Sequence, residues 1–401
     1  MSTMSTMITR MEAWTQSERG KRITRHGLFL LGVCALIALT ASTFGYIGAA
    51  LTAAPSASAP TISPTEQATT MQAQTTSSPG AAGVSVTAAH EQVYSLPQTN
   101  PGLMYPVVDA QGNIWFGEMS QNALARLNPG AGTVQSWKAP NGQYNIMEVA
   151  IDAQGNVWFA EQAANYLGRF DPTTQTFTTY PLAKVNGHGA GPEGLVFDAQ
   201  GRLWFTETIG NRIGRLDPAT GQFAFWPLPN DSPGDPAYPY ALALAPDGSV
   251  WYGSLNGGVV GRLDPATGQV TLRHLKSAQT TVFAMTSDAQ GRIWFTELLD
   301  GRLGVINTAT GQVEELTIPT ILGDPSGIYG VAIAPDGNVW CASAGANALV
   351  RYTPETGAWT FYRVARANSV PYGVALVTNG SKTTLWFTAD GIPNYVGAMN
   401  A

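Results

Sequence analysis

The chain has 401 residues, with 21 lysines and arginines against 27 aspartates and glutamates, which gives a formal net charge of −6. This acidic balance argues against a nucleic-acid partner, because binding a phosphate backbone requires clustered positive charge. Only Cys34 and Cys341 are cysteines, so no disulfide framework is expected.

The N-terminal part predicts a membrane-linked protein. Residues 1–26 form a basic leader, and residues 27–54 contain no charged side chain. Such a run is either a transmembrane anchor or a signal peptide, and the basic residues before it predict a cytoplasmic N-terminus. We therefore expect a single-pass cell-membrane protein with the rest of the chain outside, or a secreted protein.

The next segment, residues 55–89, is rich in Ala, Ser, Thr, Pro and Gln. This composition predicts a disordered tether, because it offers too little apolar surface to form a core. The remainder, residues 90–401, is expected to be the folded domain.

That domain is a repeat. The stretch "GRLWFTETIGNRIGRLDPATGQF", which starts at Gly201, has recognisable relatives along the whole domain. Each copy carries one marker tryptophan, and successive markers are 43–47 residues apart: Trp115, Trp158, Trp204, Trp251, Trp294, Trp340 and Trp386. A period of this length predicts a solenoid, a propeller or a similar array.

One copy contains four strand-like runs. In the third copy these are "GLVFDA", "RLWFTE", "RIGRLDP" and "FAFWPLP", separated by turn residues such as Gly, Asn, Asp and Pro. No run has a helical period. The sequence therefore predicts an all-β, seven-bladed propeller with four strands per blade, and the absence of any Trp-Asp dipeptide argues against the WD40 type.

The two ends of the domain predict how the ring closes. The last copy stops after its third strand, at Ala401, while "EQVYSLPQ" (residues 91–98) resembles a fourth strand. We expect this N-terminal strand to complete the last blade and so remove an open edge. The marker tryptophans are expected in the core. Cys341 stands where other copies have Phe, and we expect it to be a small core residue.

Two positions in each copy are predicted to face the mouth of the central channel. The first lies at the start of the innermost strand: Met104, Met147, Glu193, Tyr240, Phe283, Tyr329 and Tyr372, with Glu148 next to Met147. The second lies three residues after the marker tryptophan: Glu118, Glu161, Glu207, Ser254, Glu297, Ser343 and Ala389. Tyr240, Phe283, Tyr329 and Tyr372 are therefore predicted to contact a ligand.

The acidic residues allow two interpretations. Glu161, Glu193 and Glu207 could bind a hard cation such as Mg²⁺ or Ca²⁺, or act in acid–base chemistry with His188, which precedes Glu193 in the loop "VNGHGAGPEG". Alternatively, the recurring glutamates, Glu118, Glu161, Glu207 and Glu297, bind backbone amides of the turn that follows each of them.

The pattern "WFTETIGNRIGR" (residues 204–215) resembles that of the virginiamycin B lyase family, or streptogramin lyases, and the resemblance covers residues 95–401. It implies a seven-bladed propeller that opens a cyclic depsipeptide by elimination at its ester, using Mg²⁺, a histidine base and acidic residues. The family's two histidines correspond here to Tyr329 and Tyr372, and one acidic position corresponds to Val370. The family's glutamate after the last marker tryptophan corresponds to Asp390.

Three functions are compatible with these residues. The first is a monomeric binding propeller for a small molecule, a peptide or a glycan. The second is a carbon–oxygen lyase with a relocated base, in which His188, Glu193 and Asp390 are the candidate catalytic residues. The third is a metal-dependent, lactonase-like hydrolase.

Overall fold

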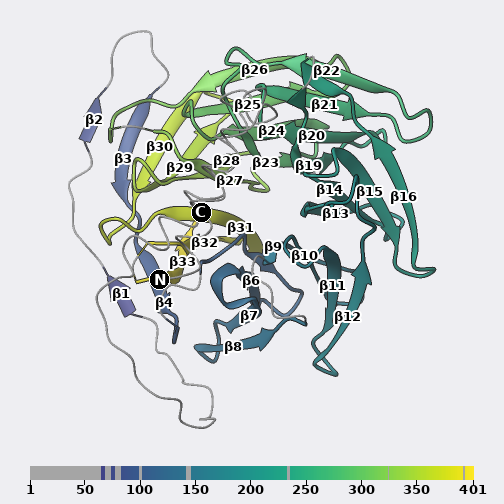
Figure 1. Cartoon of the computed structure of the whole chain (residues 1–401). Helices are drawn as coiled ribbons and strands as arrows, with labels where there is room; N and C mark the ends of the chain where they lie inside the picture. Colours follow the sequence, from purple (N-terminus) through teal and green to yellow (C-terminus); the bar gives the residue numbers. More distant parts are fainter. Residues whose placement is uncertain are drawn as a thin grey trace, which may run out of the picture. The chain divides into compact units, whose positions relative to one another are not determined.

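Seven antiparallel sheets lie around one axis, as the repeat predicts (Figure 1). The computed structural model describes residues 83–98, 102–140, 146–232, 235–323, 325–391 and 393–401, together with the backbone of 65–67 and 74–76. The predicted leader (1–26) and apolar run (27–54), and most of the tether (55–89), lie outside the described residues. No helix within the described ranges is both long and apolar enough to span a membrane.

The first three blades follow one another along the chain, and each strand pairs with the next. Blade 1 contains β5 (Val107–Val108), β6 (Ile114–Glu118), β7 (Ala123–Asn128) and β8 (Thr133–Lys138), with a short 3₁₀ turn, η2 (Met119–Gln121), after β6. Blade 2 contains β9 (Ile146–Ile151), β10 (Val157–Glu161), β11 (Tyr166–Asp171) and β12 (Thr176–Pro181). Blade 3 contains β13 (Pro192–Phe197), β14 (Leu203–Glu207), β15 (Arg212–Asp217) and β16 (Gln222–Pro227).

The next three blades repeat this arrangement. A small ladder of β17 (Asn230–Ser232) and β18 (Asp235–Pro236) precedes blade 4, which contains β19 (Pro239–Leu244), β20 (Val250–Ser254), β21 (Val259–Leu263) and β22 (Val270–His274). Blade 5 contains β23 (Val282–Ser287), β24 (Arg292–Glu297), β25 (Arg302–Asn307) and β26 (Gln312–Thr317). Blade 6 contains β27 (Ile328–Ile333), β28 (Val339–Ser343), β29 (Ala348–Thr353) and β30 (Ala358–Arg363).

Blade 7 confirms the predicted closure. It contains β31 (Pro371–Asn379), β32 (Lys382–Ala389) and β33 (Tyr395–Asn400), and its fourth strand is the N-terminal β4 (Glu91–Ser95). Tyr94 pairs with Val396 in the antiparallel ladder between β4 and β33. The innermost strands contact one another in order around the ring, and β31 contacts β5, so the circle is complete.

A further strand lies just before the closing strand. β3 (Val84–Ala88) runs parallel to β30 at the outer edge of blade 6, with Val86 opposite Phe361. The end of the segment predicted as a tether is thus paired with a blade. Two short strands extend these edges, because β2 (Gln74–Thr76) pairs with β3 and β1 (Thr65–Gln67) pairs with β4.

The marker tryptophans fill the interfaces between blades. Seven apolar clusters occur, one at each contact between neighbouring sheets, and each cluster contains one marker. Every marker is between 0 and 6% exposed. Burying an indole of this size contributes on the order of 4–6 kcal/mol as an upper bound. The repeated tryptophan is therefore a packing residue, as expected.

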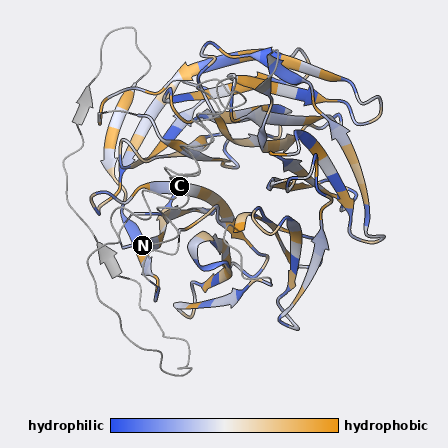
Figure 2. Cartoon of the chain, viewed as in Figure 1, coloured by the Kyte–Doolittle hydropathy of each residue, from blue (hydrophilic) through white to orange (hydrophobic). Residues whose placement is uncertain are grey.

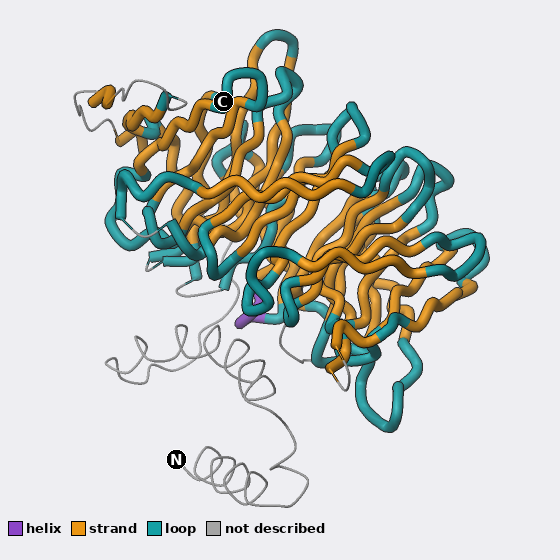
Figure 3. The backbone as a smooth tube through the Cα atoms, turned by 90° about the horizontal axis from the view of Figure 1, so that it is seen from above, coloured by secondary structure: helices purple, strands orange, loops and turns teal. Residues whose placement is uncertain are grey.

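The remaining repeated residues support these tryptophans. The indole N–H of Trp204 donates to Asp198 over 2.8 Å, and equivalent bonds join Trp115, Trp158 and Trp294 to aspartates six residues earlier. The turn Asn211 adopts a left-handed φ of 50°, and its side-chain amide donates to the carbonyl of Leu228. Hydrophobic and hydrophilic residues alternate along the strands (Figure 2), and the loops lie at the strand ends (Figure 3). The recurring pattern thus encodes the fold.

Cys341 is buried as expected, and the structure explains why the repeat changes there. In blade 3, Gly214 lies under the ring of Phe205, and a Cβ on this glycine would lie 2.2 Å from Phe205 Cζ. In blade 6 the equivalent pair is Cys341 opposite Val350, both at most 1% exposed. The smaller cysteine makes room for the valine side chain.

This compensation predicts a non-additive pair of substitutions. Cys341→Phe alone should destabilise the protein by about 1–3 kcal/mol, because the ring would overlap Val350. The double variant C341F/V350G, which restores the arrangement of blade 3, should recover most of this loss. Thermal denaturation of the two single variants and the double variant measures the coupling. Simple addition of the two single effects would contradict the proposed packing.

Candidate functional site

A bulge in every innermost strand sets the residues that face the axis. In blade 3, Pro192 pairs with Glu207 and Leu195 pairs with Phe205, so the inner strand has one residue more than its partner. The same shift occurs in the other blades. Since a bulge redirects side chains, Glu193 and its equivalents are turned toward the channel.

The four predicted ligand-contacting aromatic residues form one cluster around the axis. Their ring centroids are 4.8 Å apart for Tyr240 and Phe283, 5.2 Å for Phe283 and Tyr329, and 4.3 Å for Tyr329 and Tyr372. Tyr105 joins from blade 1, 5.4 Å from Tyr372 and 6.2 Å from Phe283. These five residues are called the aromatic cluster below.

The aromatic cluster fills the channel at this level. Tyr240, Phe283 and Tyr372 are 8%, 2% and 4% exposed. The hydroxyl of Tyr105 lies 3.5 Å from the carbonyl oxygen of Phe283, which belongs to a blade across the ring. Aromatic side chains therefore close the channel at this level, where we expected an open mouth. Tyr105 and Tyr329 are half-buried, so these two side chains remain partly accessible to solvent.

Tyr105 was not predicted, although a signal for it exists. The residue that directly follows the axis-facing position of each inner strand is small in five blades: Gly194, Ala241, Ala284, Gly330 and Gly373. Glycine is needed in blade 3, because a Cβ on Gly194 would lie 2.5 Å from the carbonyl oxygen of Tyr240 in the next blade. Only blades 1 and 2 have large residues at this position, Tyr105 and Glu148.

Two carboxyl groups lie beside the aromatic cluster, the buried Glu193 and the half-buried Glu148. Glu193 is 2% exposed, and Gln162 donates to its Oε1, while its Oε2 is buried without a hydrogen-bond partner. Burial, and then the nearby Glu148, raise the pKa of Glu193 well above its usual value. Burial also raises the pKa of Glu148 to about 8, against a hydrogen bond from the Leu195 backbone that lowers it. Glu148 is therefore largely protonated at neutral pH, and the shift of the Glu193 pKa favours the neutral form of that group as well.

Asp390 occupies the edge of the same face. Its Oδ1 accepts the backbone N–H of Leu103 over 3.0 Å and the amide of Asn394 over 2.8 Å. Burial raises the pKa of Asp390 to about 6, although these hydrogen bonds oppose the change. Its charge in turn helps to raise the pKa of Tyr372, after the larger effects of burial and of Tyr329. Asp390 thus remains charged at neutral pH.

The third predicted catalytic residue lies apart from these carboxyl groups. His188 ends a hairpin turn in which it exchanges two backbone hydrogen bonds with Val185, and its side chain is exposed. No contact joins its imidazole to Glu193 or Asp390 in the part of the chain that the structure describes. The structure thus brings Glu193 and Asp390 to one face of the propeller, but it does not bring His188 into contact with them.

The predicted metal ligands do not form one group. Glu161 accepts the backbone N–H of Ala164, as the structural interpretation of the recurring glutamates expects, and Glu207 forms an ion pair with Arg212. Each side chain is fully buried and contacts a group of its own blade, although Oε1 of Glu161 has no hydrogen-bond partner. Across the described ranges, no three His, Cys, Asp or Glu side chains are grouped as a metal ion would require. These residues do not fit Mg²⁺ or Ca²⁺.

The tyrosines at the positions of the family's histidines are poor bases. Burial raises the pKa of Tyr329, and Asp390 adds to this effect. Burial raises the pKa of Tyr372 further, together with the neighbouring Tyr329. Because an unperturbed phenol already titrates near pH 10, neither hydroxyl can accept a proton at neutral pH.

Comparison with solved structures places the fold among known propellers. The chain is 24% identical to a catalytically inactive variant of virginiamycin B lyase from Staphylococcus aureus with quinupristin, covering 78% of this chain and 99% of that one, with a TM-score of 0.69. A streptogramin B lyase structure is 25% identical over 78% of this chain and 97% of that one, with the same TM-score of 0.69.

A more distant likeness is to an extracellular domain of a hybrid two-component system from B. thetaiotaomicron, 16% identical, over 78% of this chain and 43% of that one, with a TM-score of 0.60. No curated protein matches the chain. The model of the virginiamycin B lyase family matches residues 72–329 and 232–401, which together span the whole propeller. The chain therefore belongs to the virginiamycin B lyase family.

Proposed function

We propose that this chain is an extracytoplasmic propeller that binds, and does not cleave, a small-molecule or peptide ligand carrying an amine cation. The ligand sits on the aromatic cluster, with its cation at Glu193. The observation that carries this proposal is the Oε2 atom of Glu193, a buried carboxyl oxygen without a hydrogen-bond partner beside five aromatic rings.

The chemistry of this face favours a cation over other ligands. A buried polar atom without a partner is costly, and a ligand ammonium group would supply the missing donor. Aromatic faces attract cations as well, by about 0.5–2 kcal/mol for each contact. An anionic ligand would instead meet Asp390, and it would find no basic side chain among the residues that form this face.

Tyr329 and Tyr372 favour ligand binding over the elimination reaction that the family's enzymes catalyse. A lyase needs a base that is unprotonated near neutral pH and positioned to reach the substrate proton. The positions that hold histidines in the family carry Tyr329 and Tyr372, whose raised pKa values exclude this role. The exposed turn of His188 offers no obvious replacement.

One observation favours a second candidate, a carbon–oxygen lyase with a relocated base. Asp390 has a pKa of about 6 and lies on the same face as Glu193. In this alternative Asp390 would accept the substrate proton, and the protonated Glu193 would donate one to the leaving carboxylate. Quinupristin accompanies the lyase variant from Staphylococcus aureus in its structure. If the chain turned over quinupristin and Asp390→Asn abolished this turnover, the result would favour this candidate.

The proposed location rests on the N-terminal sequence. A basic leader followed by 28 residues without charge (27–54) suits a membrane anchor or an export signal. Extracellular domains of two-component systems are among the proteins with a similar fold. Protease treatment of intact cells should remove the propeller while the leader stays protected, if residues 27–54 anchor the chain.

Proton release tests the proposed binding mode. Burial raises the pKa of Glu193 well above its usual value, and an ammonium group favours the ionised carboxylate, so binding should be accompanied by proton release. We expect this in calorimetric titrations with butylammonium and with a short lysine peptide, repeated in two buffers of different ionisation enthalpy.

The matched control separates this site from other buried carboxyl groups. Glu193→Gln should abolish the proton release and weaken binding. Glu161→Gln, which alters a buried glutamate that binds its own turn, should change neither quantity. Equal heats in both buffers for the unmodified protein would rule out the proposed ionisation of Glu193.

A further inference from the structure

An exposed apolar side chain lies beside the strand that carries Glu193. Ile209 is 54% exposed, more than any other large apolar side chain of the described residues. It belongs to the turn after β14, and its N–H donates to the carbonyl of Ala190 over 3.0 Å. A Cβ on Gly191, two residues before Glu193, would lie 3.0 Å from Cγ1 of Ile209. Ile209 thus lies at the same face of the propeller as the candidate site.

The residue just before an inner strand has a recurring backbone role. Its carbonyl oxygen accepts the N–H of the residue four positions after the marker tryptophan. In blades 1, 3 and 6 this residue is Gly102, Gly191 or Gly327, with a φ of 67°, 66° or 71°. Glycine adopts this left-handed conformation without steric cost, whereas a residue with a Cβ is strained there.

Two blades keep a side chain at this strained position. Tyr238 in blade 4 has a φ of 46°, and Val370 in blade 7 has a φ of 50°. Each makes the recurring bond, because Leu255 donates to Tyr238 and Asp390 donates to Val370, both over 3.1 Å. Strain of this kind is concentrated at ligand sites. Val370 indeed borders Asp390 of the candidate site, and Tyr238 is the second such residue.

The geometry of blade 6 indicates where a side chain at this position lies. A Cβ on Gly327 would be 3.2 Å from Cβ of Ala344 in the turn and 3.7 Å from Cε2 of Tyr329 at the axis. The equivalent axis residue in blade 4 is Tyr240, a member of the aromatic cluster. Tyr238 itself is half-buried, so part of its side chain is accessible to solvent.

Ile209 and Tyr238 come from neighbouring segments of blades 3 and 4. The hydroxyl of Thr208, which precedes Ile209, donates to the carbonyl of Pro239, which follows Tyr238, over 2.7 Å. Glu193 and Tyr240 are the second residues of β13 and β19, the inner strands that start beside these segments. The two accessible side chains are therefore continuous with the candidate site.

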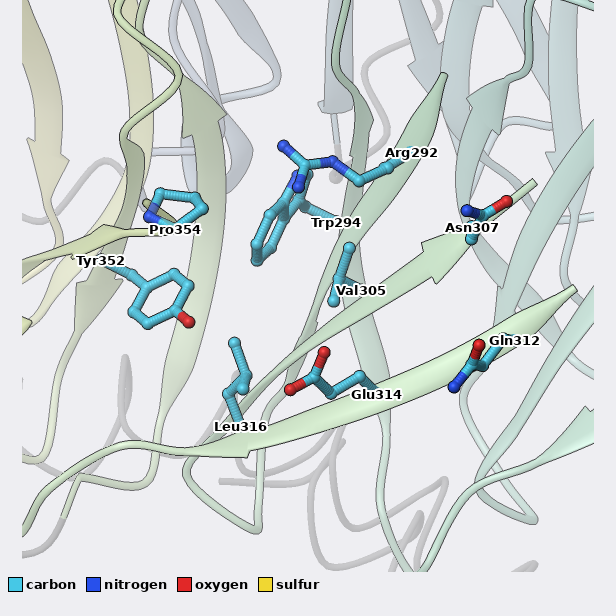
Figure 4. Close-up of a pocket in the computed structure, with 9 residues that line it drawn as sticks. All are labelled: Arg292, Trp294, Val305, Asn307, Gln312, Glu314, Leu316, Tyr352 and Pro354. Atoms are coloured by element: carbon cyan, nitrogen blue, oxygen red, sulfur yellow. The ribbon is translucent and has the colours of Figure 1, made fainter. Parts of the chain in front are cut away.

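The pocket between blades 5 and 6 offers no comparable surface (Figure 4). It measures about 280 Å³, but the indole of Trp294 in its lining is only 2% exposed, and Arg292 lies 5.2 Å from that ring. Glu314 adds a charge of the opposite sign. Free apolar surface next to a buried carboxyl group is thus a feature of the mouth of blades 3 and 4.

We propose that Ile209 and Tyr238 form an apolar subsite, and that the amine ligand carries an aromatic group which binds there. This inference rests on the proposed function, because it takes the ammonium group to lie at Glu193. An aromatic group suits the subsite, since it can pack on the phenol of Tyr238 and cover the exposed Ile209. The ligand class is thereby narrowed from amines in general to arylalkyl amines.

Calorimetric titration of the full chain with phenethylammonium and butylammonium tests the subsite. The parent should bind phenethylammonium at least about tenfold more tightly, because the ring adds apolar area that the subsite can bury. Ile209→Ser should reduce this preference at least about threefold, and the exposed position should leave folding intact. Leu299→Ser alters the equivalent turn residue of blade 5, which is 42% exposed, and should leave both affinities unchanged.

A second set of variants tests the strained residue. Tyr238→Gly and Tyr238→Ala should both weaken phenethylammonium binding, but the glycine variant should melt at the higher temperature, because alanine keeps the strained φ. Gln175→Gly is the matched control. Gln175 has a φ of 55° in the exposed turn between β11 and β12, where blade 3 has Gly221. It removes a similar strain and should leave binding unchanged.

The outcomes separate the subsite from the proposed function. Equal affinity of the parent for the two amines would overturn the subsite alone, and so would an Ile209→Ser or a folded Tyr238→Gly variant with the preference of the parent. If the parent bound neither amine, the proposed function would fail and the subsite would fail with it.

Discussion

Deletion of residues 1–95 is expected to prevent the propeller from forming a stable monomer. Without β4, the last strand β33 becomes an open edge, and Trp386 loses the ring of Tyr94, whose centroid lies 5.6 Å away. Val93 and Tyr94 are only 2% and 3% exposed, and burial of each such side chain contributes about 1.5–3 kcal/mol. An open edge of this kind also invites aggregation.

Size-exclusion chromatography and thermal melting of two truncated chains would test this expectation. The chain that begins at Gly83 keeps β3 and β4 and should be a folded monomer, whereas the chain that begins at Leu96 should aggregate or melt far lower. In the full chain, Tyr94→Ala should cost about 3–5 kcal/mol, and the exposed Ser95→Ala should cost almost nothing. Equal stability of the two truncated chains would show that β4 does not close the ring.

Stability should fall as the pH rises from about 4.5 to 8. Glu148, with a pKa of about 8, remains protonated in the folded state over this range, while in the unfolded chain it ionises near its usual value of 4.5. Burial raises the pKa of Glu193 as well, so its contribution to the pH dependence has the same sign. Because both pKa values are raised on folding, their stabilising contribution is complete below pH 4.5 and is lost as the pH rises toward the folded values.

The effect should be large, since each pH unit in this window costs about 1.4 kcal/mol per carboxyl group. Burial raises the pKa of Glu91, Glu161 and Glu297 to about 7, so these residues act in the same direction. We expect a higher melting temperature at pH 5 than at pH 8. The double variant E148Q/E193Q should flatten this dependence markedly, while D198N, which alters an aspartate whose pKa is lowered, should not. An unchanged pH profile in E148Q/E193Q would contradict the raised pKa values of Glu148 and Glu193.

The fold could be predicted in detail because its main contacts repeat. Each marker tryptophan fills one interface between blades, so counting markers counts interfaces, and the likeness of residues 91–98 to a fourth strand identified the closure. β3 was missed for a physical reason. Its pairing joins Val84–Ala88 to β30, far away in the sequence, and the strand lies in a segment whose composition is typical of disorder.

The candidate site was predictable in position but not in packing. The repeat located Glu193, Tyr240, Phe283, Tyr329 and Tyr372 at the axis, since each occupies the same place in its blade. Whether these side chains line an open mouth or fill it depends on contacts across the ring, such as the one between Tyr105 and Phe283.

The most direct test of our central claim is an assay for ring opening. The full chain would be incubated with a cyclic streptogramin B depsipeptide and Mg²⁺ at neutral pH. The products would then be separated and identified by mass spectrometry. Because no base that titrates near neutral pH occupies the positions of Tyr329 and Tyr372, we predict no linear product above the protein-free control. If the parent chain forms linear product and the Asp390→Asn variant does not, the claim that this propeller binds its ligand without cleaving it is wrong.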